Sequence, residues 1–273
     1  MDLATQELIK RLHQLGPNGR AELDDAQIER IENLLTAARY DELEALCRQE
    51  KASFECGPLL WLTRHTKTEN PQYEEQGVSF LAGFPRKTYF VPLFDAFLAR
   101  HRQLYIPKSR TMMTSWAAAG FATWSAQWKQ EETVIQTMNE DKALHLIDYV
   151  SQLLRYQEPG LSRLHPIKKQ NAYSIVWEHG GAVDAVPGGA DAIRSFHPSL
   201  FIQDEAAHIA EGEESLNAVL PSQARIISIS TAAPGWFESA CSQTDAPALN
   251  VEEVMTKAEK AYPYPIDRRE FEY

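Results

Sequence analysis

The sequence predicts a layered α/β domain in which helices cover both faces of a mostly parallel sheet. Three observations support this prediction. Short apolar runs alternate with longer segments of helical periodicity between residues 93 and 231. These runs do not alternate strictly between apolar and polar residues, which is typical of strands buried on both faces. The chain has 273 residues and 44% hydrophobic content, which is enough for one such domain and a smaller appendage.

The first 92 residues predict a helical arm and an irregular segment. Apolar residues recur at helical spacing from Thr5 to about Lys51, which predicts two or three short helices. Such a charged helical arm is usually a packing or docking element. Residues 54–92 are dense in glycine, proline and aromatic residues, so we expect an irregular segment wrapped on the core.

The middle of the chain predicts two strand–helix units. A helix over 93–102 precedes a short apolar strand over 103–107, and a long helix follows over 114–130. A second apolar strand over 133–137 leads into a helix over 141–156. The buried side of this last helix is predicted to carry Leu144, Ile147, Leu153 and Leu154.

The next region predicts a hairpin and two buried strands. Segments 173–177 and 181–186 flank Glu178-His-Gly-Gly, which predicts a β-hairpin at the edge of the sheet. The apolar runs 200–204 and 225–231 predict buried parallel strands, with a helix between them around residues 213–220.

These elements suggest three parts: a helical arm over residues 1–55, the main domain over 56–242, and a tail or linker over 243–273. The tail is polar and contains Pro247, Pro263 and Pro265. It adds no further apolar periodicity to the pattern.

The composition limits the class of protein. Lys+Arg 27 against Asp+Glu 38 gives a formal net charge of −11, so any contact with nucleic acid has to be local. The cysteines Cys47, Cys56 and Cys241 form no C-x-x-C pair, which favours reduced thiols in a cytosolic compartment. No apolar run approaches the roughly 20 residues of a membrane span, and the N-terminus lacks the order of a signal peptide. We therefore expect no membrane association.

The turn between the strand at 103–107 and the helix that follows is a candidate phosphate-binding loop. Such a loop needs inward-facing N–H groups, a helix N-terminus, a cation for the phosphates and a hydroxyl for magnesium. The standard pattern G-x-x-x-x-G-K-[ST] is not matched, because Thr114 replaces the lysine and Met113 the second glycine. Ser115 keeps the hydroxyl position, and Lys108 and Arg110 supply cations. The candidate nucleotide-binding residues are Lys108, Ser109, Arg110, Thr111, Met112, Met113, Thr114 and Ser115. The alternative is a solvated loop that begins an amphipathic helix.

An acidic pair follows the apolar run at 200–203. Asp204 and Glu205 would lie at the carboxyl end of a buried strand, where open α/β sheets bind ligands. We predict that Asp204 holds magnesium and that Glu205 polarises the water that attacks the γ-phosphate. An acidic pair at a strand end is otherwise a helix cap or a solvated corner. Together with the upstream loop, the pair makes Mg²⁺-dependent ATP hydrolysis the first hypothesis.

Two further positions are candidates for roles at the same edge. Arg194 follows the glycine-rich segment Pro187-Gly-Gly-Ala and is placed to meet phosphate charge, in its own subunit or in a neighbour's site. Ser230 and Thr231 end the last strand with hydroxyls that can sense the γ-phosphate or its water. The alternatives are a surface arginine and an ordinary turn.

These motifs resemble the ATPase domain of tailed-bacteriophage terminase large subunits, the DNA-packaging motors. The resemblance rests on the segments Lys108–Ser115, Phe201–Ala206 and Ser230–Ala232, and it runs from about Trp61 to Phe237. It implies a P-loop NTPase fold of the ASCE type, a three-layer sandwich preceded by the small helical arm. The lysine-first, glycine-poor loop is a familiar variant in that family.

The resemblance implies ATP and Mg²⁺ as cofactors, with roles for individual residues. Lys108 and Arg110 would bind phosphate, Ser115 and Asp204 would hold Mg²⁺, and Glu205 would be the catalytic carboxylate. In addition, Arg194 would be an arginine finger across a ring interface, and Ser230, Thr231 and Ala232 would form a coupling motif.

The same resemblance implies partners and a location. We expect double-stranded DNA, a portal protein and a small terminase subunit as partners, and a homo-oligomeric ring that can be a monomer in isolation. The location would be the host cytoplasm, transiently at the portal vertex of the procapsid. The chain ends too soon after Phe237 for the nuclease domain of full-length members, so no DNA cleavage is expected. Candidate DNA contacts are Lys129, Arg155, Arg163, Lys168 and Lys169.

Two other functions fit the same residues. One is a helicase-like P-loop ATPase that acts on nucleic acid outside a capsid. The other is a nonhydrolysing, nucleotide-dependent docking module whose unusual loop has lost activity.

Overall fold

A computed structural model of the chain describes residues 36–37, 39–69, 81–109, 112–231 and 233–242. The chain divides into two compact units, Met1–Leu46 and Cys47–Tyr273. In the first unit, the described residues 36–37 and 39–46 are helical. The helices predicted before residue 36 and the tail predicted after residue 242 lie outside the described residues.

The second unit is built on a seven-stranded sheet, which confirms the predicted fold class. Its strands are β3 (Gln103–Lys108), β4 (Glu132–Gln136), β5 (Ile167–Gln170), β6 (Ser174–Trp177), β7 (Ala182–Val186), β8 (Leu200–Asp204) and β9 (Arg225–Thr231). Their order across the sheet is β3-β9-β8-β4-β7-β6-β5. The first five strands in this order, β3, β9, β8, β4 and β7, are parallel to one another. Strand β6 pairs antiparallel with β7, and β5 pairs antiparallel with β6. The protein is thus a mixed α/β fold with a mostly parallel sheet.

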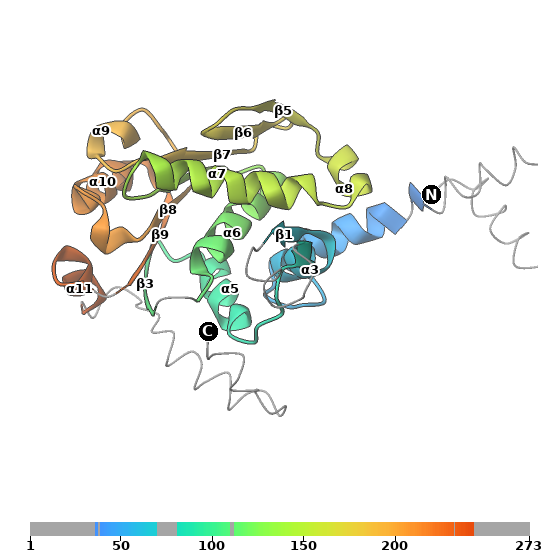
Figure 1. Ribbon diagram of the computed structural model, residues 1–273, viewed down its shortest axis with the longest axis horizontal. Coiled ribbons are helices and arrows are strands. Elements are labelled where there is room, and N and C mark those ends of the chain that lie inside the picture. The colour runs from blue at the N-terminus through green and yellow to red at the C-terminus, as the bar shows by residue number, and fades with distance from the viewer. Residues whose placement is uncertain (1–35, 38, 70–80, 110–111, 232, 243–273) are drawn as a thin grey trace, which may run out of the picture. The chain divides into compact units, whose positions relative to one another are not determined.

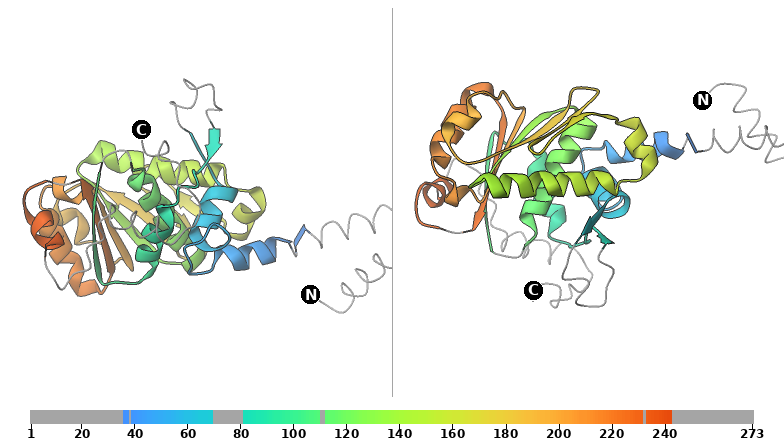
Figure 2. Two further views of the ribbon diagram at one scale, coloured as in Figure 1. Left: turned by 90° about the horizontal axis from the view of Figure 1, so that it is seen from below. Right: turned by 45° about the horizontal axis from the view of Figure 1, so that its top comes forward.

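Helices cover both faces of this sheet, as Figure 1 and Figure 2 show. One face packs against α6 (Thr114–Lys129) and α7 (Glu140–Arg155), while α9 (Ala190–Ile193), α10 (Gly212–Val219) and α11 (Trp236–Cys241) lie on the other side. Shorter helices complete the unit: α3 (Gly57–His65) and α5 (Phe90–Leu98) pack on α6, and α8 (Pro159–Leu164) follows α7. The result is the three-layer arrangement predicted from the alternating pattern.

The long helices follow from their sequences. Asn139 caps α7, because its side chain accepts a hydrogen bond from the Lys142 N–H at 3.0 Å. Helix α6 is rich in small residues and is buried on nearly every side. A Cβ on Gly120 would come within 2.7 Å of the Leu62 side chain, so α3 packs closely on this helix. Consequently α6 is held firmly, with its N-terminus at the carboxyl end of β3.

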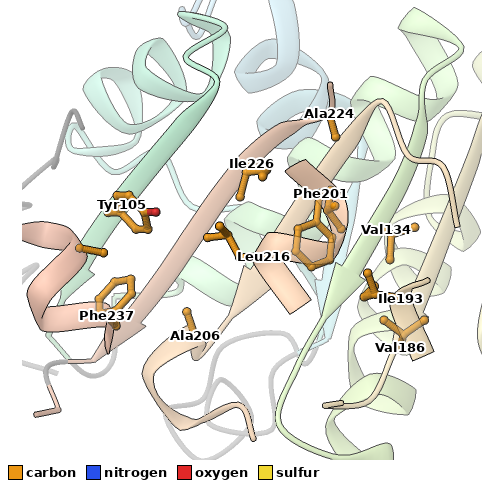
Figure 3. Packing of buried hydrophobic residues seen from close by; sticks show 12 residues of the cluster. Tyr105, Val134, Val186, Ile193, Phe201, Ala206, Leu216, Ala224, Ile226 and Phe237 are labelled. Atoms are coloured by element: carbon orange, nitrogen blue, oxygen red, sulfur yellow. The ribbon is translucent and has the colours of Figure 1, made fainter. Parts of the chain in front are cut away.

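An apolar cluster holds the opposite layer of helices to the sheet (Figure 3). Phe201 of β8 and Ile226 of β9 are fully buried there, and Leu216 of α10 packs over them. Tyr105 of β3 contacts Phe237 of α11 in an edge-to-face arrangement, with ring centroids 6.1 Å apart. Each side chain of this size stabilises the fold by about 1.5–3 kcal/mol on burial. These contacts place α10 and α11 next to the ends of the strands.

Two predictions about the fold are wrong. The segment 54–92, predicted to be irregular, contains α3, the small strands β1 (Lys67–Glu69) and β2 (Leu81–Gly83), and the start of α5. In addition, the predicted hairpin, β6 with β7, does not form the edge of the sheet, because β5 pairs outside it. All four residues of β5 are exposed, so this strand carries no apolar pattern that could reveal it.

The three cysteines are not joined by disulfides. Among the described residues, no helix has both the length and the apolar character needed to cross a membrane.

Candidate nucleotide-binding and hydrolysis site

The candidate site lies where three neighbouring parallel strands end. Strand β9 lies between β3 and β8, and its register pairs Lys108 with Thr231 and Ile229 with Asp204. The loop after β3 and the acidic pair after β8 therefore share one edge of the sheet, as the carboxyl ends of parallel strands do.

Four side chains at this edge form hydrogen-bonded pairs, and we call them the site cluster: Lys108, Ser115, Asp204 and Glu205. Lys108 Nζ donates to Glu205 Oε1 at 2.6 Å, although the two residues are 97 positions apart in the sequence. Ser115 Oγ donates to Asp204 Oδ1 at 3.1 Å. The structure thus brings together the lysine and hydroxyl of the loop and both carboxylates of the acidic pair.

The loop itself turns without glycine. Met113, which occupies the position of the second glycine in the standard pattern, has φ of 50° in the left-handed region. This conformation costs roughly 1–2 kcal/mol in a residue with a Cβ, so the surrounding contacts have to maintain it. Tyr89 contributes one such contact, because its hydroxyl donates to the Met112 carbonyl at 2.9 Å. Ser109 is exposed at the start of the loop, and Arg110 and Thr111 lie outside the described residues.

The N-terminus of α6 lies at this edge, directly after the loop. The side chain of Met113, the N-cap residue, makes no capping hydrogen bond, and the first turn of the helix contains no acidic residue. The N–H groups of the first turn, including those of Thr114 and Ser115, have no partner within the helix. These groups and the helix dipole together favour an anion such as a phosphate.

Asp204 is a buried carboxylate, with 5% of its surface exposed. Burial raises its pKa to about 6; the hydrogen bond from Ser115 opposes this rise, the charge of Glu205 adds to it, and the charge of Lys108 opposes it. Ionising Asp204 therefore costs more than ionising an ordinary aspartate, and its carboxylate takes up a proton as the pH falls through about 6. A divalent cation next to this carboxylate would lower its pKa.

Glu205 is held by three donors. Lys108 bonds to one carboxylate oxygen, and the N–H and hydroxyl of Thr231 donate to Oε2 at 3.2 and 3.1 Å. Burial raises the pKa of Glu205, but the bond and charge of Lys108, with the Thr231 bonds, outweigh it, so the pKa lies below its usual value. Its φ of 58° is left-handed and turns the chain sharply after β8. The carboxylate is therefore ionised and oriented, as a group that positions water requires.

The end of β9 joins this cluster through hydroxyl groups. Besides bonding to Glu205, Thr231 Oγ1 lies 3.1 Å from His208 Nε2, and Ser230 Oγ accepts the N–H of Ala207 at 3.1 Å. The predicted coupling residues Ser230 and Thr231 thus bind the acidic turn directly, whereas Ala232 lies outside the described residues.

Arg194 stands apart from the site cluster. It is the C-cap of α9, and its side chain is 67% exposed and pairs with Asp191. Within the described residues, no hydrogen bond or ion pair joins it to the site cluster. An arginine finger that acts on a neighbouring subunit would be exposed in this way, and the role stays a prediction.

Sequence reasoning missed several residues near the site. Trp116 stacks on Tyr149 of α7, with ring centroids 4.0 Å apart, directly after Ser115. Burial, followed by the charges of Asp204 and Asp148, raises the pKa of Tyr149. No motif marks Tyr89, which precedes α5, or Tyr149, which lies in α7. Gln203, a polar residue inside an apolar run, gave a signal.

Comparisons with known proteins give a limited result. No protein-family model matches the sequence, and no curated protein matches it. Among solved structures, the Thermus phage P74-26 large terminase ATPase domain matches with a TM-score of 0.45 and 15% identity, over 75% of this chain and 93% of that chain. A point mutant of the same domain matches with a TM-score of 0.46 and 14% identity, over 75% and 94%.

The donor set fits Mg²⁺. Asp204 offers a carboxylate and Ser115 a hydroxyl, and Mg²⁺ prefers such oxygen ligands, usually one or two carboxylates together with phosphate oxygens and water. Among the described residues, no group of three His, Cys, Asp or Glu side chains is arranged to hold a metal. The arrangement therefore suits an ion that arrives with a triphosphate.

Asp204→Asn is expected to stabilise the free protein at pH 8. The folded-state pKa of about 6 exceeds the ordinary value of 3.8, so ionising Asp204 destabilises the fold as the pH rises through this interval. Two pKa units correspond to about 3 kcal/mol of unfolding free energy. The amide keeps the Ser115 bond and carries no charge. Urea unfolding should show the full gain at pH 8, shrinking toward zero at pH 4; equal gains at both pH values would contradict the assignment.

Proposed function

We propose that this protein is a Mg²⁺-dependent ATPase. One observation carries the proposal: the cation and hydroxyl of a strand-to-helix loop meet two carboxylates with different environments at one sheet edge. The buried Asp204 suits a metal ion, and the hydrogen-bonded Glu205 suits a water molecule. The N-terminus of α6 supplies N–H groups for phosphate.

In the proposed reaction, Lys108 exchanges one partner for another. In the free protein it is bound to Glu205, and its side chain is only 6% exposed. When Lys108 moves to phosphate oxygens, Glu205 Oε1 becomes available to orient and polarise the attacking water. Thr231 keeps the other oxygen in place meanwhile. Ser115 and Asp204 would hold Mg²⁺, which neutralises charge on the phosphates.

We further propose that hydrolysis drives movement of double-stranded DNA into a procapsid. The motif resemblance to terminase large subunits supports this role, with a portal protein and a small terminase subunit as partners and a ring as the working assembly. The protein would then act in the host cytoplasm and at the portal vertex. In a ring, Arg194 would reach the site of the next subunit.

Four of the residues proposed to contact DNA are exposed, positively charged side chains. Arg155, Arg163, Lys168 and Lys169 are all exposed, on or beside α7, α8 and β5. Lys129 is different, because it pairs with Glu50 at 3.0 Å and its side chain is only 19% exposed. We therefore leave Lys129 out of the proposed contact surface. A local cationic edge is compatible with the net charge of −11.

The test of the ATPase proposal is phosphate release from ATP by the full chain. We expect release that requires Mg²⁺ and that rises when linear double-stranded DNA is added. Stimulation by a portal protein would support packaging over a helicase-like role. ATP binding with no phosphate release under any of these conditions would show a nucleotide-dependent docking module instead.

A further inference from the structure

A chain of buried hydrogen bonds crosses the adjacent strands β9, β8 and β4 at the level of Gln203, the residue before Asp204. Ser228 Oγ of β9 donates to Gln203 Oε1 of β8 at 2.8 Å. The amide of Gln203 then donates to Gln136 Oε1 of β4 at 3.2 Å. All three residues are fully buried. We call Gln136 and Gln203 the glutamine relay.

The relay continues from the sheet into the layer of α9 and α10. Gln203 Nε2 also donates to the carbonyl of Gly212, the first residue of α10, at 2.8 Å. Gln136 Nε2 donates to Ser215 Oγ of α10 at 3.0 Å and to the carbonyl of Gly189 at 3.2 Å. Gly189, with φ of 112°, forms the turn that leads into α9 and Arg194.

Both amide groups in the relay are fully used. In Gln203 and in Gln136, each Nε2 makes two hydrogen bonds as a donor and each Oε1 accepts one. The direction is fixed, because turning over Gln136 alone would bring two donor groups face to face. A complete chain of this kind allows one relative placement of the strands, the Gly189 turn and α10.

The glutamine relay lies at the end of the sheet where the candidate site is, beyond the apolar cluster that fills the rest of this layer. Phe201 and Ile226, earlier on the same faces of β8 and β9, pack in the apolar cluster. The layer becomes polar where the strands approach the candidate site: Gln203 precedes Asp204, and Gln136 is the last residue of β4. Buried amides are costly unless they are fully bonded, so an apolar residue would be the simpler filling for this space.

We propose that Gln136 and Gln203 are positioning residues that hold the Gly189–Arg194 turn and the start of α10 in register with the acidic end of β8. A shift at Asp204 and Glu205 is then transmitted to the segment that carries Arg194. A second bond supports this coupling, because Ala190 N–H donates to Glu211 Oε2 at 3.1 Å and so ties α9 to the residue before α10. The inference rests on the proposed ATPase for its turnover readout only.

The test replaces Gln136 by methionine, which keeps the length of the side chain and removes its hydrogen bonds. The Gln136 side chain bonds to Gly189, Ser215 and Gln203, so the substitution removes none of the hydrogen bonds within the site cluster. Gln127→Met is the matched control, because Gln127 is an equally buried glutamine whose amide bonds to Gln157 instead. Amide hydrogen exchange of the full chain is measured for both variants, and ATP turnover is measured alongside it.

In Gln136→Met, exchange in residues 188–195 should become about tenfold faster, while β3 and α6 keep wild-type exchange. Gln127→Met should leave residues 188–195 unchanged. We expect kcat to fall about tenfold with KM for ATP within about twofold of wild type, and we expect Gln136→Met to cause no further fall in a chain that already carries Arg194→Ala. Non-additivity of this kind would not arise from a merely structural role.

Unchanged exchange in residues 188–195, an equal effect in the control, or independent effects of Gln136→Met and Arg194→Ala would each overturn the inference. If the wild-type chain releases no phosphate, the proposed ATPase fails, and the exchange measurement still decides whether the relay holds the turn.

Discussion

Glu205→Gln is expected to bind Mg²⁺ and ATP at least as tightly as the wild-type chain and to lower kcat by about 10²–10⁴-fold. The glutamine oxygen can keep both bonds from Thr231, so the acidic turn should retain its shape. Its amide, however, is a poor acceptor for a water proton. It also cannot hold Lys108, which becomes free for phosphate before ATP arrives.

Two measurements check this expectation: titration of a fluorescent ATP analogue for binding, and phosphate release for turnover. Glu214→Gln is a suitable control, because it removes an exposed carboxylate from the first turn of α10 without touching the site. Wild-type turnover in Glu205→Gln would mean that another group orients the water, and the catalytic assignment would be withdrawn.

Lys108→Ala is expected to weaken ATP binding by at least about 100-fold and to abolish measurable hydrolysis. The ammonium group contacts Glu205 at the sheet edge where α6 begins, and charge-assisted bonds to phosphate are among the strongest in proteins. Without it, Glu205 would lose its main stabilising charge, so the pKa of Glu205 should rise from its lowered value.

Calorimetric titration with a nonhydrolysable ATP analogue and Mg²⁺ measures the loss of binding. Lys67→Ala, at an exposed position of β1, is the control for removing one positive charge from the surface. If Lys108→Ala hydrolyses ATP normally, the loop does not bind phosphate through Lys108, and the proposed reaction would be wrong in its first step.

Much of the fold was predictable because the buried strands are short apolar runs with polar ends. The predicted bounds of β8 and β9 agree with the structure, and those of β3, β4, α6 and α7 agree within one residue at either end. The spacing also identified the residues of the site cluster, since Lys108, Asp204 and Glu205 are the polar residues at the ends of such runs.

Elements without a distinctive pattern could not be predicted in this way. Strand β5 is exposed along its whole length, and α3 lies in a segment whose glycine and proline residues suggested irregular chain. Tyr89 contacts the loop from the turn before α5, and Tyr149 of α7 stacks on Trp116 of α6, so no local motif reports their contacts. The glutamine relay is similar, because a single polar residue in an apolar run does not reveal its partner.

The sequence by itself determined which segments are buried strands and which polar residues end them, because burial and hydrogen bonding impose a local periodicity. Only the tertiary structure decided the order of the strands. Placing β9 between β3 and β8 brings Lys108 within 2.6 Å of Glu205 and leaves Arg194 exposed on α9. Such contacts depend on how helices and strands that are far apart in the sequence pack together, and a local sequence pattern does not predict that packing.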